Sequence, residues 1–255
     1  QHQPIHREKS LMGMILQLSY VLVSLFIKPL TRLIVFSETQ KKSVQQSGFP
    51  AERIAIVPNA VDHLVFSPGE SAFKTNLGAK CIILYLGRFS YQKNPELVLE
   101  TFNTANYDDK VKLVMVGEGE MFGKLHSQYS LNSNIIFTGS IREREKVIDI
   151  LRGSDIFVQP SRFEGLSISL LEAMSCEVAP ITSAVAAHPD VVVEGSGILV
   201  DPAKIDKEFT EALDKMVNNE GFRNQTRKKA RERIIERYSL VGMLNDLVAL
   251  YKNLL

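Results

Sequence analysis

The chain has 255 residues, of which 45% are hydrophobic and 23% charged, and its formal net charge is +1. This composition is typical of a globular protein and excludes the disordered and fibrous classes. The near-zero charge gives no general attraction to nucleic acid, so a basic site would have to be local. The two cysteines, Cys81 and Cys176, lack disulfide or metal-site spacing and indicate a reducing, cytoplasmic compartment.

Residues 10–27 form an uncharged, largely apolar segment between Lys9 and Lys28. The segment just reaches the length at which a membrane span has to be considered. Its polar side chains favour a buried or partner-covered helix, and a helix that lies on or crosses a membrane is the alternative. The chain begins with Gln1 and has no signal-peptide pattern, so it is either processed or, as we expect, part of a longer protein.

Two short apolar runs follow this segment. The run "RLIVFSE" at 32–38 predicts a buried strand followed by a short helix, and "IAIVPNAVD" at 54–62 comes next. These strands are too few to close a sheet of their own. We therefore interpret residues 1–55 as the remnant of one domain, with "VPNAVD" as the crossing into the next.

From Cys81 onward, β-branched or apolar runs alternate with segments long enough to be helices. This alternation is typical of βαβ units and predicts a parallel sheet covered by helices on both faces. The predicted strands are 81–87, 112–117, 134–139, 155–160, 178–183 and 197–200. In such sheets ligands bind beyond the carboxyl ends of the strands. Four of those ends are marked by Gly87, Gly117, Gly139 and Pro160.

The C-terminal part of the chain predicts two further helices. Residues 221–237 are rich in Lys and Arg, and their helical periodicity favours a solvated face over a nucleic-acid patch. Residues 239–255 form an amphipathic pattern whose apolar stripe is wide enough to need a partner.

The segment "LGRFSYQKN" places Arg88 and Lys93 just after a buried strand. Two cations at the carboxyl end of a strand are costly to desolvate unless an anion binds there. A planar guanidinium beside a flexible ammonium suits a diphosphate. An ordinary loop with two solvated charges is the alternative.

The segment "SRFEGLSISLLEAM" carries Glu164 and Glu172 around an apolar run. We expect a helix to start at Gly165, with the first backbone amides available to an anion. Eight residues of continuous helix would separate the carboxylates by about 12 Å, more than the roughly 5 to 9.5 Å of glycoside hydrolases. Near a diphosphate, carboxylates would instead accept hydrogen bonds from hydroxyls, so each could bind one sugar. One glutamate at the helix dipole and one on the surface is the alternative.

Five segments follow one another along the chain in this order: "PNAVD", "LGRFSYQK", "VGEGEM", "FTGS" and "EGLSISLLEAM". Their order and spacing resemble the retaining GT-B glycosyltransferases, from about residue 30 to the end. The resemblance is most specific at the glutamate pair combined with Arg88 and Lys93. It implies an α/β fold of GT-B type, with a doubly wound, Rossmann-like donor domain at 56–238. Residues 1–55 would belong to a truncated second Rossmann-like domain, and helix 239–255 would cross back to it.

The resemblance also implies roles for individual residues. Arg88 and Lys93 would bind the donor diphosphate, Glu164 the donor sugar and Glu172 the ribose, and the first three would form the catalytic set. Further residues would line the donor, chiefly with their backbone atoms along its sugar, phosphates and base: Phe163, Gly165, Leu166, Gly87, Gly117, Thr138 and Gly139. His2 and Asn59 are further candidates. No metal or other cofactor is expected, because the two cations would take the role of a metal.

The implied activity is the transfer of a sugar, with retention, from a nucleotide-diphosphate sugar to a glycan or lipid-linked acceptor. We expect a cytoplasmic protein without nucleic-acid partners, with association at the cytoplasmic face of the membrane as an option. A GT-B sugar-nucleotide epimerase and a non-catalytic nucleotide-binding module are the alternatives. Because most of an acceptor domain is absent, we expect the chain as given to bind a nucleotide but not to transfer sugar. On these roles, Glu164→Gln should leave nucleoside diphosphate binding almost unchanged.

The chain also departs from the family pattern. Glycine is usual where this chain has Ala60, Asn94 and Glu177, and a proline is usual at Ala179. The segment "AAHPD" at 186–190 replaces a glycine pair before an acid. We interpret His188 in that loop as a structural histidine rather than a catalytic one.

Overall fold

The computed structural model describes residues 32–105 and 107–253. The candidate His2 and the apolar segment 10–27 lie outside the described residues, as do the last two residues of the C-terminal segment. Within the described ranges, no helix is long and apolar enough to cross a bilayer.

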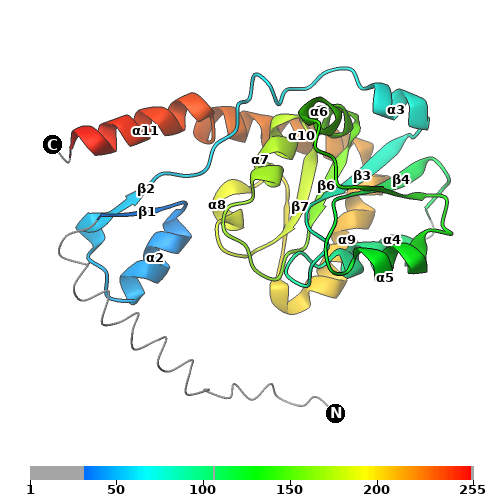
Figure 1. Cartoon of the computed structure of the whole chain (residues 1–255), viewed down its shortest axis with the longest axis horizontal. Helices are drawn as coiled ribbons and strands as arrows, with labels where there is room; N and C mark the ends of the chain where they lie inside the picture. Colours follow the sequence, from blue (N-terminus) through cyan, green and yellow to red (C-terminus); the bar gives the residue numbers. More distant parts are fainter. Residues whose placement is uncertain (1–31, 106, 254–255) are drawn as a thin grey trace, which may run out of the picture.

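A six-stranded parallel sheet forms the centre of the molecule (Figure 1). Its strands run in the order β5-β4-β3-β6-β7-β8, and every neighbouring pair is parallel. Their bounds are β3 Cys81–Leu86, β4 Val111–Val116, β5 Ile135–Gly139, β6 Ile156–Gln159, β7 Ala179–Ser183 and β8 Ile198–Val200. All six strands predicted from Cys81 onward are therefore confirmed.

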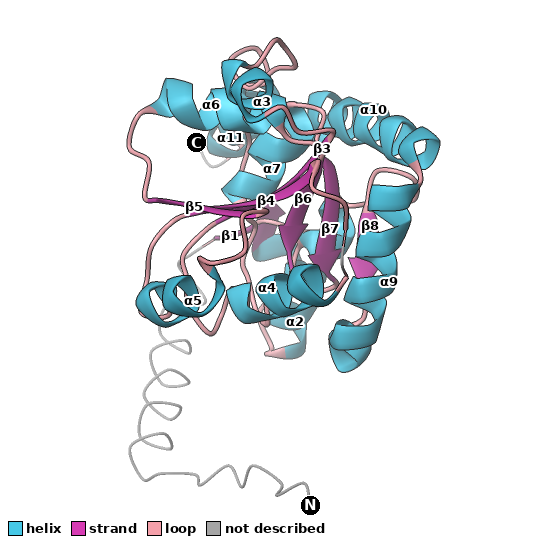
Figure 2. Cartoon of the chain, turned by 90° about the vertical axis from the view of Figure 1, so that its right-hand side faces the viewer, coloured by secondary structure: helices cyan, strands magenta, loops and turns pink. Residues whose placement is uncertain are grey.

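Helices cover both faces of this sheet, as Figure 2 shows. One face packs against α4 Pro95–Thr104, α5 Phe122–Tyr129 and α9 Ile205–Asn218. The other packs against α3 Ala72–Leu77, α6 Arg144–Gly153, α7 Ile168–Ser175, α8 His188–Val191 and α10 Glu220–Arg237. Side chains of β3 alternate between the two cores, with Ile83 in one and Ile82 in the other, and both are fully buried. This burial on both faces explains why the strands are almost continuously apolar in sequence.

A smaller unit precedes the large sheet. It consists of the parallel strands β1 Leu33–Val35 and β2 Ile54–Ile56, with helix α2 Glu38–Gln46 between them. Single 3-10 turns lie at Ala51–Arg53 and Pro202–Lys204. The strand and short helix predicted near 32–38 are thus confirmed. Together with the large sheet, this unit confirms the expected doubly wound α/β class.

The C-terminal helix α11, Leu240–Lys252, follows α10 and extends over the side of the molecule that holds β1 and β2 (Figure 1). The chain enters and leaves the large unit at one place, because Val61 N donates to Tyr238 O and Leu240 N donates to Val61 O. Side chains on one stripe of α11 are exposed: Val241, Leu244, Val248 and Tyr251. The domain limits at residues 55 and 238 stay predictions.

Among the residues that the structure describes, three that are not glycine adopt the left-handed backbone conformation: Asn94, Glu177 and Ala186, with φ of 53°, 59° and 45°. All three lie where the sequence departs from a glycine pattern. The fold has therefore kept the conformation that glycine would adopt freely. This conformation costs free energy for steric reasons, because a Cβ atom disfavours the left-handed region. The cost is smallest for asparagine.

The change Ala186→Gly should therefore stabilise the protein, by roughly 0.5 to 1 kcal/mol, since it removes the Cβ atom from a left-handed residue. Urea denaturation would measure the difference. Its neighbour Ala187 has an ordinary φ of −86°, so Ala187→Gly should have the opposite sign. A loss of stability in both variants would contradict the strain assigned to Ala186.

The side chain of Asp155 connects several elements at the amino end of β6, where it is 3% exposed. Its carboxylate accepts hydrogen bonds from the backbone of Ile82, from Lys74 at 2.7 and 2.9 Å and from Arg227 at 3.1 Å. These partners come from β3, α3 and α10. One buried carboxylate thus joins two neighbouring strands to two helices that cover the same face of the sheet.

We expect Asp155→Asn to destabilise the fold by about 2 to 3 kcal/mol, because it leaves two partly buried cations without a counter-charge. Equilibrium denaturation in urea is the measurement. The exposed pair Lys207–Glu211 supplies a control, and Glu211→Gln should cost less than about 0.5 kcal/mol. Equal effects of the two changes would show that Asp155 has no special structural role.

Candidate functional site

The strand order reverses between β3 and β6, since β3 continues to β4 on one side and β6 to β7 on the other. Such a switch point is where ligands bind in open parallel sheets, beyond the carboxyl ends of the strands. The loops that leave these two ends are residues 87–94 and 160–167, which we call the switch loops. Every charged residue predicted for the site lies on them except Glu172, which follows in α7.

The structure brings Lys93 and Glu164 together across the switch point. The Lys93 ammonium forms an ion pair with Glu164 Oε2, and only 18% and 12% of the two side chains are exposed. The same carboxylate oxygen accepts a hydrogen bond from Gln159 Nε2 at 3.0 Å and lies 3.4 Å from the Ser161 hydroxyl. Glu164 is thus held by three groups, which come from the end of β6 and from both switch loops.

Backbone and side-chain contacts also tie the two switch loops to each other. Arg162 N donates to Gln92 O at 2.8 Å, and Gln92 Nε2 donates to Phe163 O at 3.1 Å. The Arg162 guanidinium donates to Asn94 Oδ1 at 3.2 Å and stacks over the Tyr91 ring at 4.3 Å. These contacts fix the loops in place, so the ion pair lies in a preorganised frame.

Arg88 differs from Lys93, because its side chain is exposed and has no hydrogen bond or ion pair within 32–105 and 107–253. Its backbone is well anchored, since Arg88 O accepts from the Tyr85 hydroxyl at 2.7 Å. Burial raises the pKa of that hydroxyl, which keeps it a proton donor. The guanidinium is therefore free to bind an anion.

Glu172 lies in α7, partly buried. Burial raises the pKa of its carboxyl to about 7, and nearby Arg144 partly offsets this. Asn59, from the segment after β2, donates to Leu166 O at 3.1 Å. Asn59 and Leu166, both predicted for the site, are thus in direct contact. Phe163, in the same switch loop as Leu166, is 57% exposed.

The start of α7 differs from the prediction. The helix begins at Ile168 rather than Gly165, and Ser167 is its N-cap, accepting a hydrogen bond from Leu170 N. A serine hydroxyl caps helices well, so residues 164–166 are left in the loop. The expected run of eight helical residues between Glu164 and Glu172 is therefore wrong, because only the last part of this segment is helical.

The glycines at the neighbouring strand ends lie side by side. Gly87 N donates to Val116 O, and Gly117 N donates to Gly139 O, while Thr138 turns its hydroxyl to Gly139 O. A Cβ atom at Gly117 would lie 2.0 Å from Gly87 O, so close backbone packing accounts for this glycine. A Cβ atom at Gly165 would meet nothing within 4 Å, which leaves space beside the switch loop 160–167.

Two residues near the site have partners that sequence reasoning missed. Gln159 was not singled out, although a polar residue that ends the buried run "DIFVQP" is a signal for it. His188 is fully buried, and its Nδ1 lies 3.0 Å from Ser183 O while its Nε2 has no hydrogen-bond partner. Burial lowers the pKa of this imidazole and favours its neutral form.

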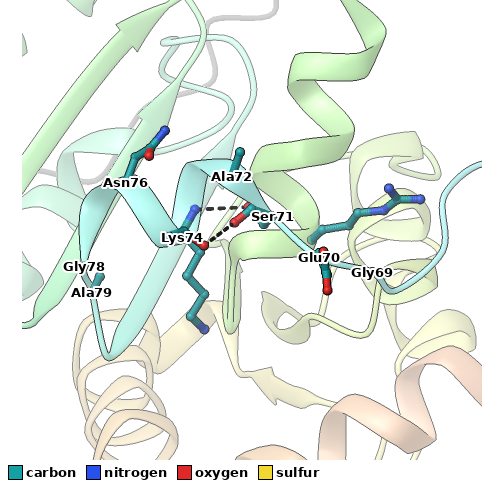
Figure 3. Close-up of a pocket in the computed structure, with 10 residues that line it drawn as sticks. Gly69, Glu70, Ser71, Ala72, Lys74, Asn76, Gly78 and Ala79 are labelled. Atoms are coloured by element: carbon teal, nitrogen blue, oxygen red, sulfur yellow. Dashed lines mark hydrogen bonds between the residues drawn. The ribbon is translucent and has the colours of Figure 1, made fainter.

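A hollow with a volume of about 800 Å³ lies elsewhere, at α3 (Figure 3). It lies beside the amino ends of β3 and β6, and several of its polar groups are bonded within the fold. Ser71 donates to Asp149 O and caps α3, Lys74 binds Asp155, and Arg152 donates to Ser67 O. We do not assign a ligand to this hollow. No group of three His, Cys, Asp or Glu suited to a metal ion occurs in the part of the chain that the structure describes.

Comparison with known proteins identifies the family. Residues 69–233 match the family described as Glycosyl transferases group 1. The chain belongs to this family of glycosyltransferases. The match covers most of the large sheet, both switch loops and most of α10, so it includes every charged residue of the candidate site.

Curated relatives of this chain carry names that specify different substrates. The UDP-Gal:alpha-D-GlcNAc-diphosphoundecaprenol alpha-1,3-galactosyltransferase of Escherichia coli is 28% identical, over 87% of this chain and 60% of its own. The GPI3 subunit of phosphatidylinositol N-acetylglucosaminyltransferase from Saccharomyces cerevisiae is 22% identical, over 91% of this chain and 53% of its own. The chain therefore spans little more than half the length of these curated relatives.

Solved structures confirm the GT-B fold. Sucrose-phosphate synthase from Thermosynechococcus elongatus has a TM-score of 0.77 at 23% identity, covering 87% of this chain and 57% of its own. The Anabaena protein HepE, solved in complex with UDP, also has a TM-score of 0.77, at 16% identity, covering 88% of this chain and 64% of its own. The family resemblance inferred from the five sequence segments is confirmed.

The raised pKa of the Glu172 carboxyl gives the folded protein a pH-dependent stability. The folded protein holds this proton up to about pH 7, whereas the unfolded chain releases it near 4.5. The stabilisation is therefore complete below pH 4.5 and is lost as the pH rises to about 7.

Between pH 5 and pH 8, we expect the unfolding free energy of wild type to fall by more than that of Glu172→Gln. The difference should be on the order of 2 kcal/mol after allowance for the partial exposure of Glu172. Urea denaturation at several pH values would measure this difference. Parallel pH profiles of the two proteins would mean that the Glu172 carboxyl titrates normally.

Proposed function

We propose that the chain binds a nucleotide-diphosphate sugar over the two switch loops and is the donor-binding part of a retaining hexosyltransferase. The observation that carries this proposal is the meeting of Lys93 and Glu164 across the switch point. Arg88 lies on the same loop as Lys93, and its side chain has no partner among the described residues. A cation for phosphate and a carboxylate for sugar hydroxyls are both needed where a diphosphate joins a sugar. The HepE structures with UDP and with UDP-glucose support the same class of ligand.

In this proposal Arg88 and Lys93 bind the diphosphate. Arg88 can offer a planar fork of donors to two phosphate oxygens, and Lys93 a single mobile charge. As the sugar departs, negative charge develops on the leaving phosphate, and two fixed cations stabilise it. This electrostatic stabilisation is the main catalytic contribution of the chain's own residues, and it fits the expectation that no metal is required.

Glu164 and Glu172 bind the two sugars of the donor. Glu164, held by Gln159 and Ser161, accepts hydroxyls of the transferred sugar. Glu172 accepts hydrogen bonds from the ribose hydroxyls. Its pKa of about 7 leaves part of the carboxyl protonated at neutral pH, and hydroxyl donors favour the charged form, so binding of the ribose shifts Glu172 towards the carboxylate. The space above Gly165 admits the sugar and phosphate path, with backbone of Phe163 and Leu166 beside it. Backbone around Gly117 and the Thr138–Gly139 turn faces the base.

The acceptor is a glycan or a lipid-linked sugar. The name of the Escherichia coli relative specifies a diphosphoundecaprenol-linked acceptor, which supports a lipid-linked one here. We therefore propose a role in polysaccharide or glycolipid biosynthesis, in the cytoplasm or at the cytoplasmic face of a membrane. An acceptor has to be positioned against the anomeric carbon, and that positioning supplies several kcal/mol of a transfer barrier. Transfer by the whole protein thus depends on residues that hold the acceptor.

Titration calorimetry with UDP, GDP and ADP tests the donor site. We expect Arg88→Ala and Lys93→Ala each to weaken binding of the preferred nucleotide about tenfold, because each removes a charge-assisted contact to phosphate. Arg88→Ala should unfold at nearly the wild-type temperature. Lys93→Ala should unfold at a lower temperature, because it leaves the buried Glu164 carboxylate without a counter-charge, so its affinity is measured well below that temperature. As a matched control, Lys124→Ala removes a surface cation of α5 that pairs with Glu96, and it should leave affinity unchanged. Wild-type protein that binds none of the three nucleotides would contradict the proposed function.

A further inference from the structure

The ion pair between Lys93 and Glu164 joins two groups that would contact different parts of a donor. Lys93 is expected at the diphosphate and Glu164 at the transferred sugar. Without a ligand each neutralises the other, and both side chains are more than four-fifths buried. A phosphate that needs the Lys93 ammonium therefore meets it already bound to a carboxylate.

The two partners are not held equally. Glu164 Oε2 also accepts a hydrogen bond from Gln159 Nε2 and lies near the Ser161 hydroxyl. Its Oε1 lies 3.4 Å from Gly165 N, so both carboxylate oxygens are held. No other hydrogen bond or ion pair of the Lys93 side chain occurs within the described ranges. Lys93 also carries four rotatable methylene groups. If one partner moves when a ligand arrives, it is Lys93.

We propose that Glu164 competes with the donor diphosphate for Lys93, so that the site prefers a nucleotide sugar over the spent nucleoside diphosphate. This inference rests on the proposed function. When the sugar is present, its hydroxyls donate to Glu164 in place of Lys93, and the ammonium is free for phosphate. When the sugar has left, the buried carboxylate has no other cation and draws Lys93 back, which weakens the hold on the product.

The competition reverses what the sequence alone leads us to expect. A residue assigned to the sugar should not affect binding of a ligand without a sugar. Since Glu164 holds Lys93, however, Glu164→Gln should release the ammonium and strengthen UDP binding. It should also weaken UDP-glucose binding, because an amide accepts hydroxyls less strongly than a carboxylate.

The test is titration calorimetry of wild type and variants with UDP and UDP-glucose, or with the matching pair if the protein prefers GDP or ADP. For Glu164→Gln we expect about a tenfold gain in UDP affinity and a loss for the nucleotide sugar, so that the preference collapses. Glu164→Asp is the sharper variant, because it keeps the charge but withdraws the carboxylate from Lys93. It should also gain UDP affinity, which loss of simple charge repulsion could not explain.

Two controls isolate the contact. Glu120→Gln removes a negative charge from an exposed residue after the neighbouring strand β4, with no ion pair in the described part of the chain, and UDP affinity should change less than about twofold. In a Lys93→Met background, Glu164→Gln should give no gain, because the contested ammonium is absent. Thermal unfolding of each variant verifies that the fold is intact.

The outcomes are distinct. If the Lys93 ammonium instead bridges the carboxylate and the phosphate at once, UDP affinity will be unchanged or lower in Glu164→Gln and Glu164→Asp. That result would overturn the proposed competition. A gain that persists in the Lys93→Met background overturns it as well. If wild type binds no nucleotide, the proposed function fails and this inference falls with it. Normal wild-type binding with unresponsive Glu164 variants rejects the competition alone.

Discussion

The buried carboxylate of Asp155 is the constraint on which the site depends. The two halves of the sheet meet only where β3 pairs with β6, and the paired residues are Ile83 with Ile156 and Leu84 with Phe157. Asp155 closes the amino end of this short ladder by accepting from Ile82 N and from cations of α3 and α10. Because Asp155 holds the amino ends of β3 and β6 together, the chain can diverge after their carboxyl ends. The switch loops follow those carboxyl ends, so the position of the site depends on a contact at the opposite edge of the sheet.

The two edges of the switch point use the same kind of interaction differently. At the amino edge, Asp155 is saturated by two cations and a backbone amide, none of which is available to a ligand. At the carboxyl edge, Glu164 pairs with one flexible lysine, and Arg88 beside it has no partner among the described residues. A saturated carboxylate rigidifies a fold, whereas a singly paired one can exchange its partner. This difference separates the structural acid from the functional one.

Much of the fold could be predicted because its signals are local. Each strand is a β-branched run that ends in a turn residue, and Arg88, Lys93 and Glu164 could be found because they follow such runs. The order of the strands is not local, so nothing in the sequence places Lys93 against Glu164, 71 residues away. The Asp155 network and the role of Gln159 depend on the same order. The start of α7 was misplaced because Ser167, and not the preceding glycine, competes best for the cap.

The strained backbone positions are explained by the same contacts. Asn94, in a switch loop, accepts a hydrogen bond from Arg162 of the other switch loop. The carbonyl of Glu177 accepts from Arg227, the residue that also binds Asp155. Ala186 precedes Ala187, whose amide faces Gly165 O. Left-handed conformations of residues with a Cβ atom persist only where the surroundings over-determine them. Here each is adjacent to a bond that holds one edge of the switch point, so tertiary contacts impose a shape that glycine would adopt freely.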